Sequence, residues 1–409
     1  MTQTCRHCHA PLTRPFLDLG YAPPSNAYLA PEALHRAEVT YPLRLMVCDS
    51  CFLVQTEDFA APEALFDADY AYFSSTSRGW LDHGARYAAM VRDRFALDAD
   101  SFVIEVASND GYLLRNFVQA GVPCLGIEPT ASTAAAAEAQ GIPVLREFFG
   151  QALGARLAGE GRQADLIAGN NVFAHVPDIN DFARGLAGAL KPEGVITLEF
   201  PHLMRLVEFC QFDTVYHEHY SYLSLVSVQR ILAAAGLRVF DVEQLPTHGG
   251  SLRVYACHET ASHPEHLGVA ALLAEERRRG MENHAYYDSF QPRADALKDA
   301  LLRFLLDAKR DGRTVAAYGA AAKGNTLLNY AGVKPDLVPF VCDAAEAKQG
   351  KFLPGSHIPI HAPDMLDRVR PDFVLILPWN IVDEVRAQLD HLARRGTRLV
   401  IAVPELTIL

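Results

Sequence analysis

Short apolar runs alternate with amphipathic, helix-like segments through most of the chain, and this alternation predicts the fold. In the middle of the chain, apolar runs that are typical of strands occupy 102–106, 124–127, 165–168 and 195–198. Helical patterns between them begin near Tyr112 and Ala131 and cover 182–190. Strands that alternate with helices form a mainly parallel sheet, so the pattern predicts a doubly wound α/β domain.

The last third of the chain repeats this pattern. Strand-like runs occupy 314–318, 337–342 and 373–377, and helix-like segments begin near Leu327 and Ile381. The long segment 258–311 between the two α/β regions is charged and helix-rich. We therefore expect a helical connector that leads into a second, C-terminal Rossmann-like α/β domain.

Composition restricts the class of protein. With 409 residues the chain is long enough for about three domains. A net charge of −12 disfavours a protein that neutralises nucleic-acid phosphates. The first five residues lack the basic and apolar pattern of a leader, and no run of about 18 apolar residues follows. We expect a cytoplasmic protein with neither nucleic acid nor membrane as partner.

Two Cys-x-x-Cys pairs near the N-terminus, Cys5 with Cys8 and Cys48 with Cys51, predict a metal site. Each turn presents two thiolates, and four thiolates suit a tetrahedral Zn²⁺ ion. Such a site leaves no open position for water, so the predicted role of the zinc is structural. Two local disulfides or a redox pair are the alternatives, and a cytosolic setting without thioredoxin-like context disfavours both.

Two further features accompany these cysteines. His7 and His9 are competing ligands, although the spacing favours the cysteines. The segment between the two pairs is longer than in a compact zinc ribbon and includes Pro23, Pro24 and Asn26. We predict that it forms an ordered loop that packs on the catalytic domain.

Polar residues follow the predicted strands of the middle region. Ligands of doubly wound sheets bind outside the carboxyl ends of the strands, and an acidic residue after the second strand commonly holds a ribose. Glu128 has that place, and Asn170 and Asn171 follow a later strand. The predicted cofactor-binding residues are Glu105, Ser108, Asn109, Gly111, Glu128, Asn170 and Asn171.

The first strand-to-helix turn resembles the acid-x-Gly-x-Gly-x-Gly loop of S-adenosylmethionine (SAM) enzymes. Glu105 supplies the acid and Gly111 the last glycine, whereas Ala107 and Asn109 replace the other two. A generic turn that binds nothing is the alternative, because the glycine pattern alone has low specificity. Glu128 and the two asparagines argue for the cofactor.

The sequence Tyr216-His217-Glu218-His219 places a phenol, two imidazoles and a carboxylate in one short loop. Groups of this kind can remove a proton beside a ketone and hold the enolate. An aromatic core loop is one alternative. A metal at His217 and His219 is another, but residues two apart face opposite sides of a strand and the His-Glu-x-x-His spacing is absent.

In the last third, the strand-like run ends at Gly319 and small residues lead through Lys323 to Asn325. Small residues let backbone approach a diphosphate at a helix N-terminus, and Lys323 adds a charge. The P-loop order is absent. A solvated lysine is the alternative, and Arg253 is a weaker phosphate candidate. The predicted substrate-binding residues are Lys323, Asn325 and Arg253.

Taken together, these motifs resemble the sugar C-methyltransferases of deoxysugar biosynthesis. The paired Cys-x-x-Cys pattern, Glu-x-x-Ser-Asn-Asp-Gly, Gly-Ile-Glu-Pro, Asn-Asn-Val-x-x-His-Val-Pro-Asp, Tyr-x-Glu-His and Gly-Ala-x-x-Lys-Gly-Asn cover nearly the whole chain. The resemblance implies SAM-dependent methylation at C-3 of a nucleotide-linked 4-keto-6-deoxy sugar, commonly dTDP-linked. It also implies three domains, with zinc in the first.

By motif position, the resemblance implies that His219 is the general base, assisted by Tyr216, Glu218, His175 and Tyr70. Glu218 is expected to orient His219, and Tyr216 or His175 to donate to the ketone oxygen. The sequence departs from the family at Ala107, where glycine is usual, and at His217 inside the base motif. The choice of base among His219, His217 and His175 therefore stays open.

We accordingly predict an α/β protein in three parts. These are an N-terminal zinc-binding module at 1–65, a central Rossmann-like SAM methyltransferase domain at 66–257, and the connector with the C-terminal nucleotide-sugar-binding domain at 258–409. The expected cofactors are SAM and structural zinc, and the expected partner is a small nucleotide-sugar substrate. Two alternatives are methylation of a different nucleotide-linked keto sugar and a SAM- or nucleotide-binding protein without catalysis.

Overall fold

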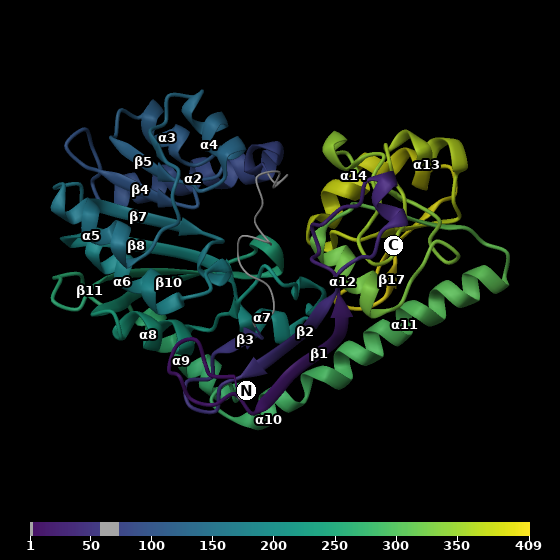
Figure 1. Ribbon diagram of the computed structural model, residues 1–409, viewed down its shortest axis with the longest axis horizontal. Helices are drawn as coiled ribbons and strands as arrows, with labels where there is room; N and C mark the ends of the chain where they lie inside the picture. The colour runs from purple at the N-terminus through teal and green to yellow at the C-terminus, as the bar shows by residue number, and fades with distance from the viewer. Residues whose placement is uncertain (1–2, 58–72) are drawn as a thin grey trace.

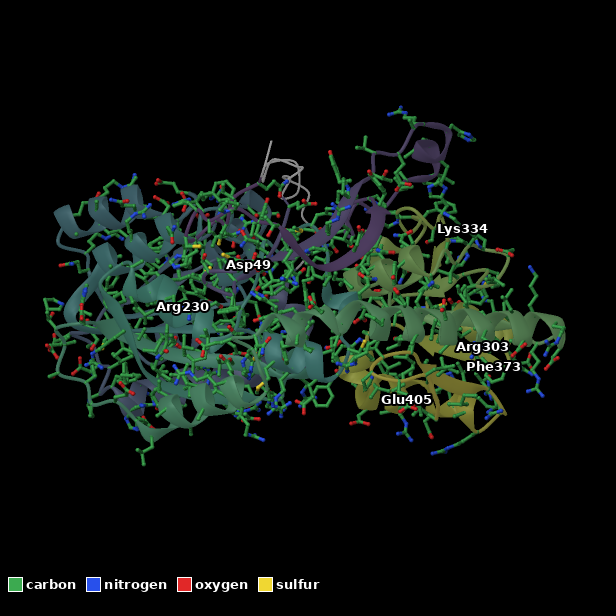
Figure 2. The ribbon with its side chains drawn as sticks, turned by 90° about the horizontal axis from the view of Figure 1, so that it is seen from below. Asp49, Arg230, Arg303, Lys334, Phe373 and Glu405 are labelled. Carbon is green, nitrogen blue, oxygen red and sulfur yellow. The ribbon has the colours of Figure 1, made fainter. Side chains whose placement is uncertain are left out.

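The computed structural model describes residues 3–57 and 73–409, and its strands form three sheets. Figure 1 shows two lobes, with strands β1 and β2 between them and helix α11 along the second lobe. In Figure 2, Asp49 and Arg230 lie in the first lobe, and Arg303, Lys334, Phe373 and Glu405 lie in the second. The N-terminal sheet and the connector therefore join the two α/β regions.

The N-terminal sheet is antiparallel, in the order β1-β2-β3-β9. Its strands are β1 (Arg14–Ala22), β2 (Tyr41–Val47), β3 (Val54–Thr56) and β9 (Ser221–Tyr222). The expectation of a loop between the cysteine pairs was therefore wrong for much of that segment. Leu43, Leu45 and Val47 alternate along β2 and are buried, which is the pattern of a strand with one face on a core.

The central sheet has the order β10-β11-β8-β7-β4-β5-β6. Strands β4 to β8 are parallel to one another, and β11 is antiparallel to β8 and β10. The strands are β4 (Val103–Val106), β5 (Cys124–Ile127), β6 (Val144–Leu145), β7 (Ala164–Asn170), β8 (Leu190–Pro201), β10 (Leu237–Leu245) and β11 (Ser251–His258). This confirms the predicted mainly parallel sheet.

Helices connect these strands and bury their apolar faces against the sheet. They are α2 (Arg78–Arg94), α3 (Leu114–Gln119), α4 (Ala131–Glu138), α5 (Gln151–Gly159), α6 (Ile179–Ala189), α7 (Leu203–Glu208) and α8 (Leu225–Ala233). The order of the strands reverses between β4 and β7. A ligand site is expected at that point, outside the carboxyl ends of the two strands.

The connector is helical, as predicted, and comprises α9 (Leu267–Arg278), α10 (His284–Asp288) and α11 (Phe290–Arg310). A buried carboxylate holds α9 on the central domain. Glu276 accepts hydrogen bonds from the backbone of Leu225 and Val226 and contacts His202 at 2.7 Å. Phe16 of β1 stacks on Phe290 at the start of α11. The connector therefore contacts both other regions.

The C-terminal sheet has the order β14-β13-β12-β15-β16-β17, parallel except for β17. Its strands are β12 (Val315–Tyr318), β13 (Val341–Cys342), β14 (Ile360–His361), β15 (Phe373–Ile376), β16 (Arg398–Ile401) and β17 (Thr407–Ile408). Helices α12 (Ala322–Tyr330), α13 (Asp364–Val369) and α14 (Val382–Ala393) pack on it. The strand predicted at 337–342 is shorter than expected.

The observed architecture confirms the predicted fold class. In the described ranges, no helix combines the length and the apolar character that crossing a bilayer requires.

Candidate functional site

The four predicted cysteines lie together beside the N-terminal sheet. Their sulfur atoms are all within 4.8 Å of one another, with Cys5 Sγ 3.5 Å from Cys51 Sγ and Cys8 Sγ 3.4 Å from Cys48 Sγ. Zn–S bonds of about 2.3 Å in a tetrahedron separate the sulfurs by roughly 3.8 Å, so the cluster fits zinc. Disulfide bonds of about 2.05 Å do not fit these distances.

The competing ligand His7 is engaged elsewhere. Its Nδ1 lies 2.8 Å from Asn180 Oδ1, and the Asn180 side chain donates to the backbone oxygens of Arg6 and His7. Gln55 Nε2 donates to Cys5 Sγ. Helix α6 and strand β3 therefore hold the turn that carries the first cysteine pair.

The turn after β4 is built from left-handed backbone. Ala107, Asn109 and Gly111 have φ values of 56°, 50° and 79°. Glycine is the usual residue at such angles. Ala107 and Asn109 therefore have the backbone conformation that the glycines of the SAM-enzyme loop would adopt, although they are not glycines. A Cβ at Gly111 would lie 2.3 Å from Ile142 Cδ1, so any other residue there would displace the Ile142 side chain.

Glu128, at the end of β5, is held by this turn. Its carboxylate accepts hydrogen bonds from the backbone N–H groups of Asn109 and Thr130, both at 2.9 Å. The neighbouring Glu105 is buried, and burial, with a smaller contribution from Glu128, raises its pKa well above the usual value. Asn170 Nδ2, at the end of β7, donates to the Tyr112 hydroxyl at 3.4 Å.

Several buried polar atoms around this turn have no hydrogen-bond partner within the part of the chain that the structure describes. They are Glu105 Oε2, Ser108 Oγ, Asp110 Oδ1, Asn170 Oδ1 and Asn171 Oδ1. Buried polar groups are normally paired, so this set fits a polar ligand such as the amino-acid and ribose parts of SAM. These atoms lie where the order of the strands reverses.

His219 and His175 face each other at the next loop. Their ring centroids are 4.5 Å apart, and the Tyr216 ring lies 4.0 Å from that of His219. His219 Nδ1 is 3.0 Å from the Thr214 carbonyl, and His175 Nδ1 is 2.8 Å from the Glu218 carbonyl. A carbonyl only accepts, so each Nδ1 carries the proton and Nε2 of neutral His219 is the proton-accepting nitrogen.

Burial keeps both imidazoles neutral. It lowers the pKa of His175 to about 4 and that of His219 well below the usual value. In His219 the nearby His175 adds to the effect of burial on the pKa. Both rings are therefore in the form that accepts a proton at pH 7, which general-base chemistry requires.

The other two residues of the motif face away from His219. Glu218 Oε1 accepts a hydrogen bond from Asn26 Nδ2 at 3.1 Å, so its carboxylate holds the N-terminal module. The expectation that Glu218 orients His219 was wrong, because the Thr214 carbonyl does so. His217 Nε2 contacts the Pro42 carbonyl at 3.2 Å, and its ring packs on Tyr41.

The sequence did not single out His248 as a site residue. It lies in the 3₁₀ turn η5 (Thr247–Gly249) with φ of 53°, which is uncommon for a residue with a side chain. Its Nε2 is 3.4 Å from Asn171 Nδ2, and its ring packs on Trp80 at 5.1 Å. The glycines at 249 and 250 were the only local signal for this turn.

Lys323 lies at the start of α12, between the carboxyl ends of β12 and β15. Its Nζ donates to Asn380 Oδ1 at 2.6 Å and lies 4.6 Å from the centre of the Trp379 ring. Burial lowers the pKa of Lys323 to about 8, partly offset by the Asp213 carboxylate. This position is also where the strand order of the C-terminal sheet reverses.

The other two predicted substrate residues make protein contacts. Asn325 Nδ2 donates to the Ser25 carbonyl at 2.6 Å. Arg253 is buried in β11, where its guanidinium pairs with Glu199 and Glu243, both at 2.7 Å. Two carboxylates neutralise Arg253, so the structure does not support its assignment to a substrate phosphate.

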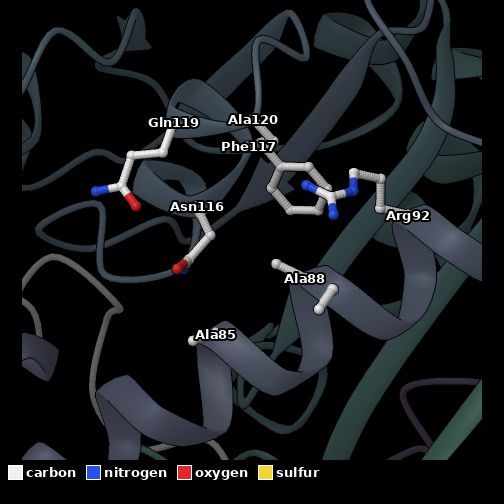
Figure 3. Close-up of a pocket in the computed structure, with 8 residues that line it drawn as sticks. Ala85, Ala88, Arg92, Asn116, Phe117, Gln119 and Ala120 are labelled. Atoms are coloured by element: carbon white, nitrogen blue, oxygen red, sulfur yellow. The ribbon is translucent and has the colours of Figure 1, made fainter.

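Two features remain to be described. Tyr70, the fifth predicted catalytic residue, falls outside the described residues. A cavity of about 240 Å³ lies between α2 and α3, where Arg92, Asn116 and Phe117 line it (Figure 3). None of its lining residues was predicted to bind cofactor or substrate.

Three family profiles match this chain. Residues 5–66 match "Putative zinc binding domain", residues 80–242 match "Methyltransferase domain", and residues 246–404 match "C-methyltransferase C-terminal domain". The fold, the strand-end polar residues and the four cysteines thus define a SAM-dependent methyltransferase with a zinc-binding domain. The predicted enzyme class and the cofactors SAM and zinc are confirmed.

A curated relative gives the family. The chain is 33% identical over 401 residues to C-methyltransferase NovU of Streptomyces niveus, covering 98% of this chain and 95% of the relative. This chain therefore belongs to the C-methyltransferase family, and its activity is SAM-dependent C-methylation.

Solved methyltransferase structures match less of the chain. Magnesium protoporphyrin IX methyltransferase of Synechocystis PCC 6803 with bound SAM is 16% identical, with TM-score 0.34, over 44% of this chain and 80% of that one. The 1,6-didemethyltoxoflavin-N1-methyltransferase of Burkholderia thailandensis is 16% identical, with TM-score 0.37, over 50% of this chain and 95% of that one.

Proposed function

We propose that the enzyme methylates C-3 of a nucleotide-linked 4-keto-6-deoxy sugar through an enolate formed by His219. The observation that carries the proposal is the contact between His219 Nδ1 and the Thr214 carbonyl, which makes Nε2 the proton acceptor. His219 lies beside the loop that follows β7, next to the strand ends assigned to the cofactor. Proton removal and methyl transfer would thus occur at neighbouring positions.

Proton removal needs more than a base. A hydrogen beside a ketone is less acidic than an unperturbed imidazolium by roughly a dozen pK units, or about 16 kcal/mol at 1.36 kcal/mol per unit, and the lowered pKa of His219 widens this gap. A preorganised donor to the enolate oxygen typically supplies about 3–4 kcal/mol. Tyr216, whose ring lies 4.0 Å from that of His219, is the proposed donor, with Tyr70 and His175 as further members of the site.

In the proposed reaction, His219 Nε2 takes the C-3 proton and the electron pair of that C–H bond enters the enolate. When bound, SAM would supply an electrophilic methyl group to the C-3 carbanion, and the electron pair of the broken S–CH₃ bond would leave with S-adenosylhomocysteine. The carbonyl of Thr214 holds the imidazole while Nε2 carries the proton. Glu105, Ser108, Asn109, Gly111, Glu128, Asn170 and Asn171 are proposed to hold the cofactor.

The nucleotide is proposed to bind at the C-terminal domain. The Lys323 ammonium has a neutral amide, that of Asn380, as its hydrogen-bond acceptor. A diphosphate would be a stronger partner for a cation at a helix N-terminus. Lys323→Ala should raise the KM for the nucleotide sugar more than that for SAM, with the exposed Lys334 substituted in parallel as control. Equal changes in the KM values for the two substrates would contradict the assignment of Lys323 to the nucleotide site.

The substrate is tested by incubating the enzyme with SAM and a panel of nucleotide-linked keto sugars that vary in nucleotide and in the position of the ketone. Mass spectrometry should detect the gain of one CH₂ unit, and NMR should locate the methyl group at C-3 of the dTDP-linked 4-keto-6-deoxy sugar. A methyl group at another carbon, or on another nucleotide sugar only, would favour the alternative substrates.

The base is tested with His219→Asn, which should keep SAM binding and lose about 10²–10⁴-fold in kcat. His217→Asn is the matched variant, because His217 faces Pro42 and Tyr41. Wild-type turnover in His219→Asn, with loss in His217→Asn or His175→Asn, would transfer the role of base to that histidine.

A further inference from the structure

Three parts of the chain that are far apart in sequence meet at the backbone segment that orients His219. They are the loop after β1, the N-terminal half of α12, and the segment that leads into the Tyr-His-Glu-His motif. This segment contains the 3₁₀ turn η4 (Phe212–Thr214). Ser25, Thr326 and Asp213 are buried at this junction. Figure 1 shows β1 and α12 adjacent between the two lobes.

Hydrogen bonds from the C-terminal domain hold the residues on both sides of Thr214. Thr326 Oγ1 donates to the Val215 carbonyl at 2.7 Å. Trp379 Nε1 donates to Asp213 Oδ2, also at 2.7 Å. The carbonyl of Thr214 itself accepts from His219 Nδ1. The peptide group that orients the proposed base is therefore fixed from both sides by another domain.

The N-terminal loop adds a second connection to the same motif. Asn325 Nδ2 donates to the Ser25 carbonyl at 2.6 Å, and the next residue, Asn26, donates to Glu218 Oε1 at 3.1 Å. Thr326 thus contacts the segment before His219 directly, whereas Asn325 holds the N-terminal loop whose Asn26 contacts Glu218. Each of the two side chains donates to a backbone carbonyl.

We infer that Thr326 is a positioning residue for His219, acting through the backbone of Thr214 and Val215. This inference rests on the proposed role of His219 as base. If the Val215 carbonyl lost its partner, the Thr214 carbonyl could rotate, and His219 would no longer be held with its proton on Nδ1. The C-terminal domain would therefore contribute to proton removal as well as to binding of the nucleotide.

A residue that only joined two domains would give a different result. Its substitution would reduce the stability of the protein and weaken the binding of both SAM and the sugar. Substitution of a positioning residue instead reduces kcat and leaves binding unchanged. Thr397 provides the matched control, because its buried hydroxyl also donates to a backbone carbonyl, that of Pro371, at 2.8 Å within the same domain.

The experiment compares Thr326→Val, Thr326→Ser and Thr397→Val, using SAM and the nucleotide keto sugar that gains a CH₂ unit. We expect Thr326→Val to lower kcat about tenfold, which corresponds to about 1.4 kcal/mol. The Kd for SAM and the KM for the sugar should change less than twofold. Thr326→Ser should restore most of kcat, and Thr397→Val should keep wild-type kcat at a similar loss of thermal stability.

Unchanged kcat in Thr326→Val, failure of the serine variant to restore it, or an equal fall of kcat in Thr397→Val would overturn the inference. A second comparison separates it from the role of His219. In the His219→Asn background, Thr326→Val should cause no further loss of kcat. If His219→Asn itself kept wild-type turnover, the proposed base would be wrong, whereas a further loss on adding Thr326→Val would show that Thr326 acts independently of His219.

Discussion

Substitution of Gly111 by alanine should damage both the stability of the central domain and its cofactor site. The residue has φ of 79°, in the left-handed region. A Cβ there would lie 2.3 Å from Ile142 Cδ1 and 3.2 Å from Ala137 Cβ. Both neighbours are buried, so neither can move without disturbing the core between the turn and α4.

Two contributions set the expected loss of unfolding free energy in Gly111→Ala. Left-handed backbone costs a residue with a Cβ about 1–2 kcal/mol. Overpacking a filled core typically costs a further 1–3 kcal/mol, so Gly111→Ala should lose about 2–5 kcal/mol of unfolding free energy. Gly121→Ala is the control, because Gly121 has φ of 72° and no atom lies within 4 Å of its Cβ position. Gly121→Ala should therefore lose only the backbone contribution of about 1–2 kcal/mol.

Urea unfolding followed by the fluorescence of Trp80 measures these losses. Trp80 stacks on Tyr112, the residue after Gly111, at 5.8 Å. Trp379 is the only other tryptophan of the chain, so a Trp379→Phe background makes the signal specific to Trp80. Calorimetry with SAM should show an affinity at least about tenfold lower in Gly111→Ala, because displacement of the turn moves Asn109 and Ser108.

Equal losses of unfolding free energy in the two alanine variants would refute the packing argument. An unchanged SAM affinity in Gly111→Ala, at a stability loss of the expected size, would refute the assignment of this turn to the cofactor.

Three further predictions follow from the same geometry. Protein prepared without chelator should contain one zinc ion by metal analysis, and Cys48→Ser should lose it and fold poorly, whereas Cys124→Ser should keep it. Glu128→Ala should weaken SAM binding about tenfold or more by calorimetry, since the carboxylate also holds the backbone of Asn109. Because the pKa of His175 is about 4 when folded and 6.5 when unfolded, the unfolding free energy should fall as pH decreases from 6.5 toward 4. In His175→Asn, the slope should be smaller by about 1.4 kcal/mol per pH unit.

Local sequence patterns were sufficient to predict four of the seven strands of the central sheet, β4, β5, β7 and β8, whereas β6, β10 and β11 were not predicted. The runs ending before Ala107, Glu128 and Asn171 are apolar and bounded by polar or glycine residues, and each proved to be a parallel strand. Because the carboxyl ends of parallel strands lie at one edge of a sheet, the residues that follow these strands lie together at that edge. The cysteine pairs were equally clear, because metal-ligand spacing is a local property.

Contacts between distant segments could not be predicted in this way. Nothing near Thr214 in the sequence shows that its carbonyl meets His219, or that Thr326 and Trp379 hold its neighbours. Arg253 was predicted as a weaker phosphate candidate because it follows two glycines, and its carboxylate partners on other strands could not be recognised from the sequence. A charged residue next to glycines has the same local appearance whether it binds a ligand or another side chain.

The N-terminal sheet was missed for a related reason. Strand β1 pairs with β2 after a gap of some twenty residues, with register shifts after Pro15 and Asp18, so its alternation of apolar residues is irregular. Prolines at 23 and 24 also indicated a loop. Only the pairing of the strands in space identifies this segment as a hairpin-like part of a sheet.

The pairing of β9 with β3 has a consequence for engineering this enzyme. Residues Ser221 and Tyr222, two and three positions beyond His219, complete a sheet whose other strands come from the first 56 residues. An N-terminal module transplanted from a relative would therefore bring foreign backbone partners to the strand that follows the proposed base. Chimeras that exchange the module together with 214–223 should retain turnover better than chimeras cut at the end of the module alone.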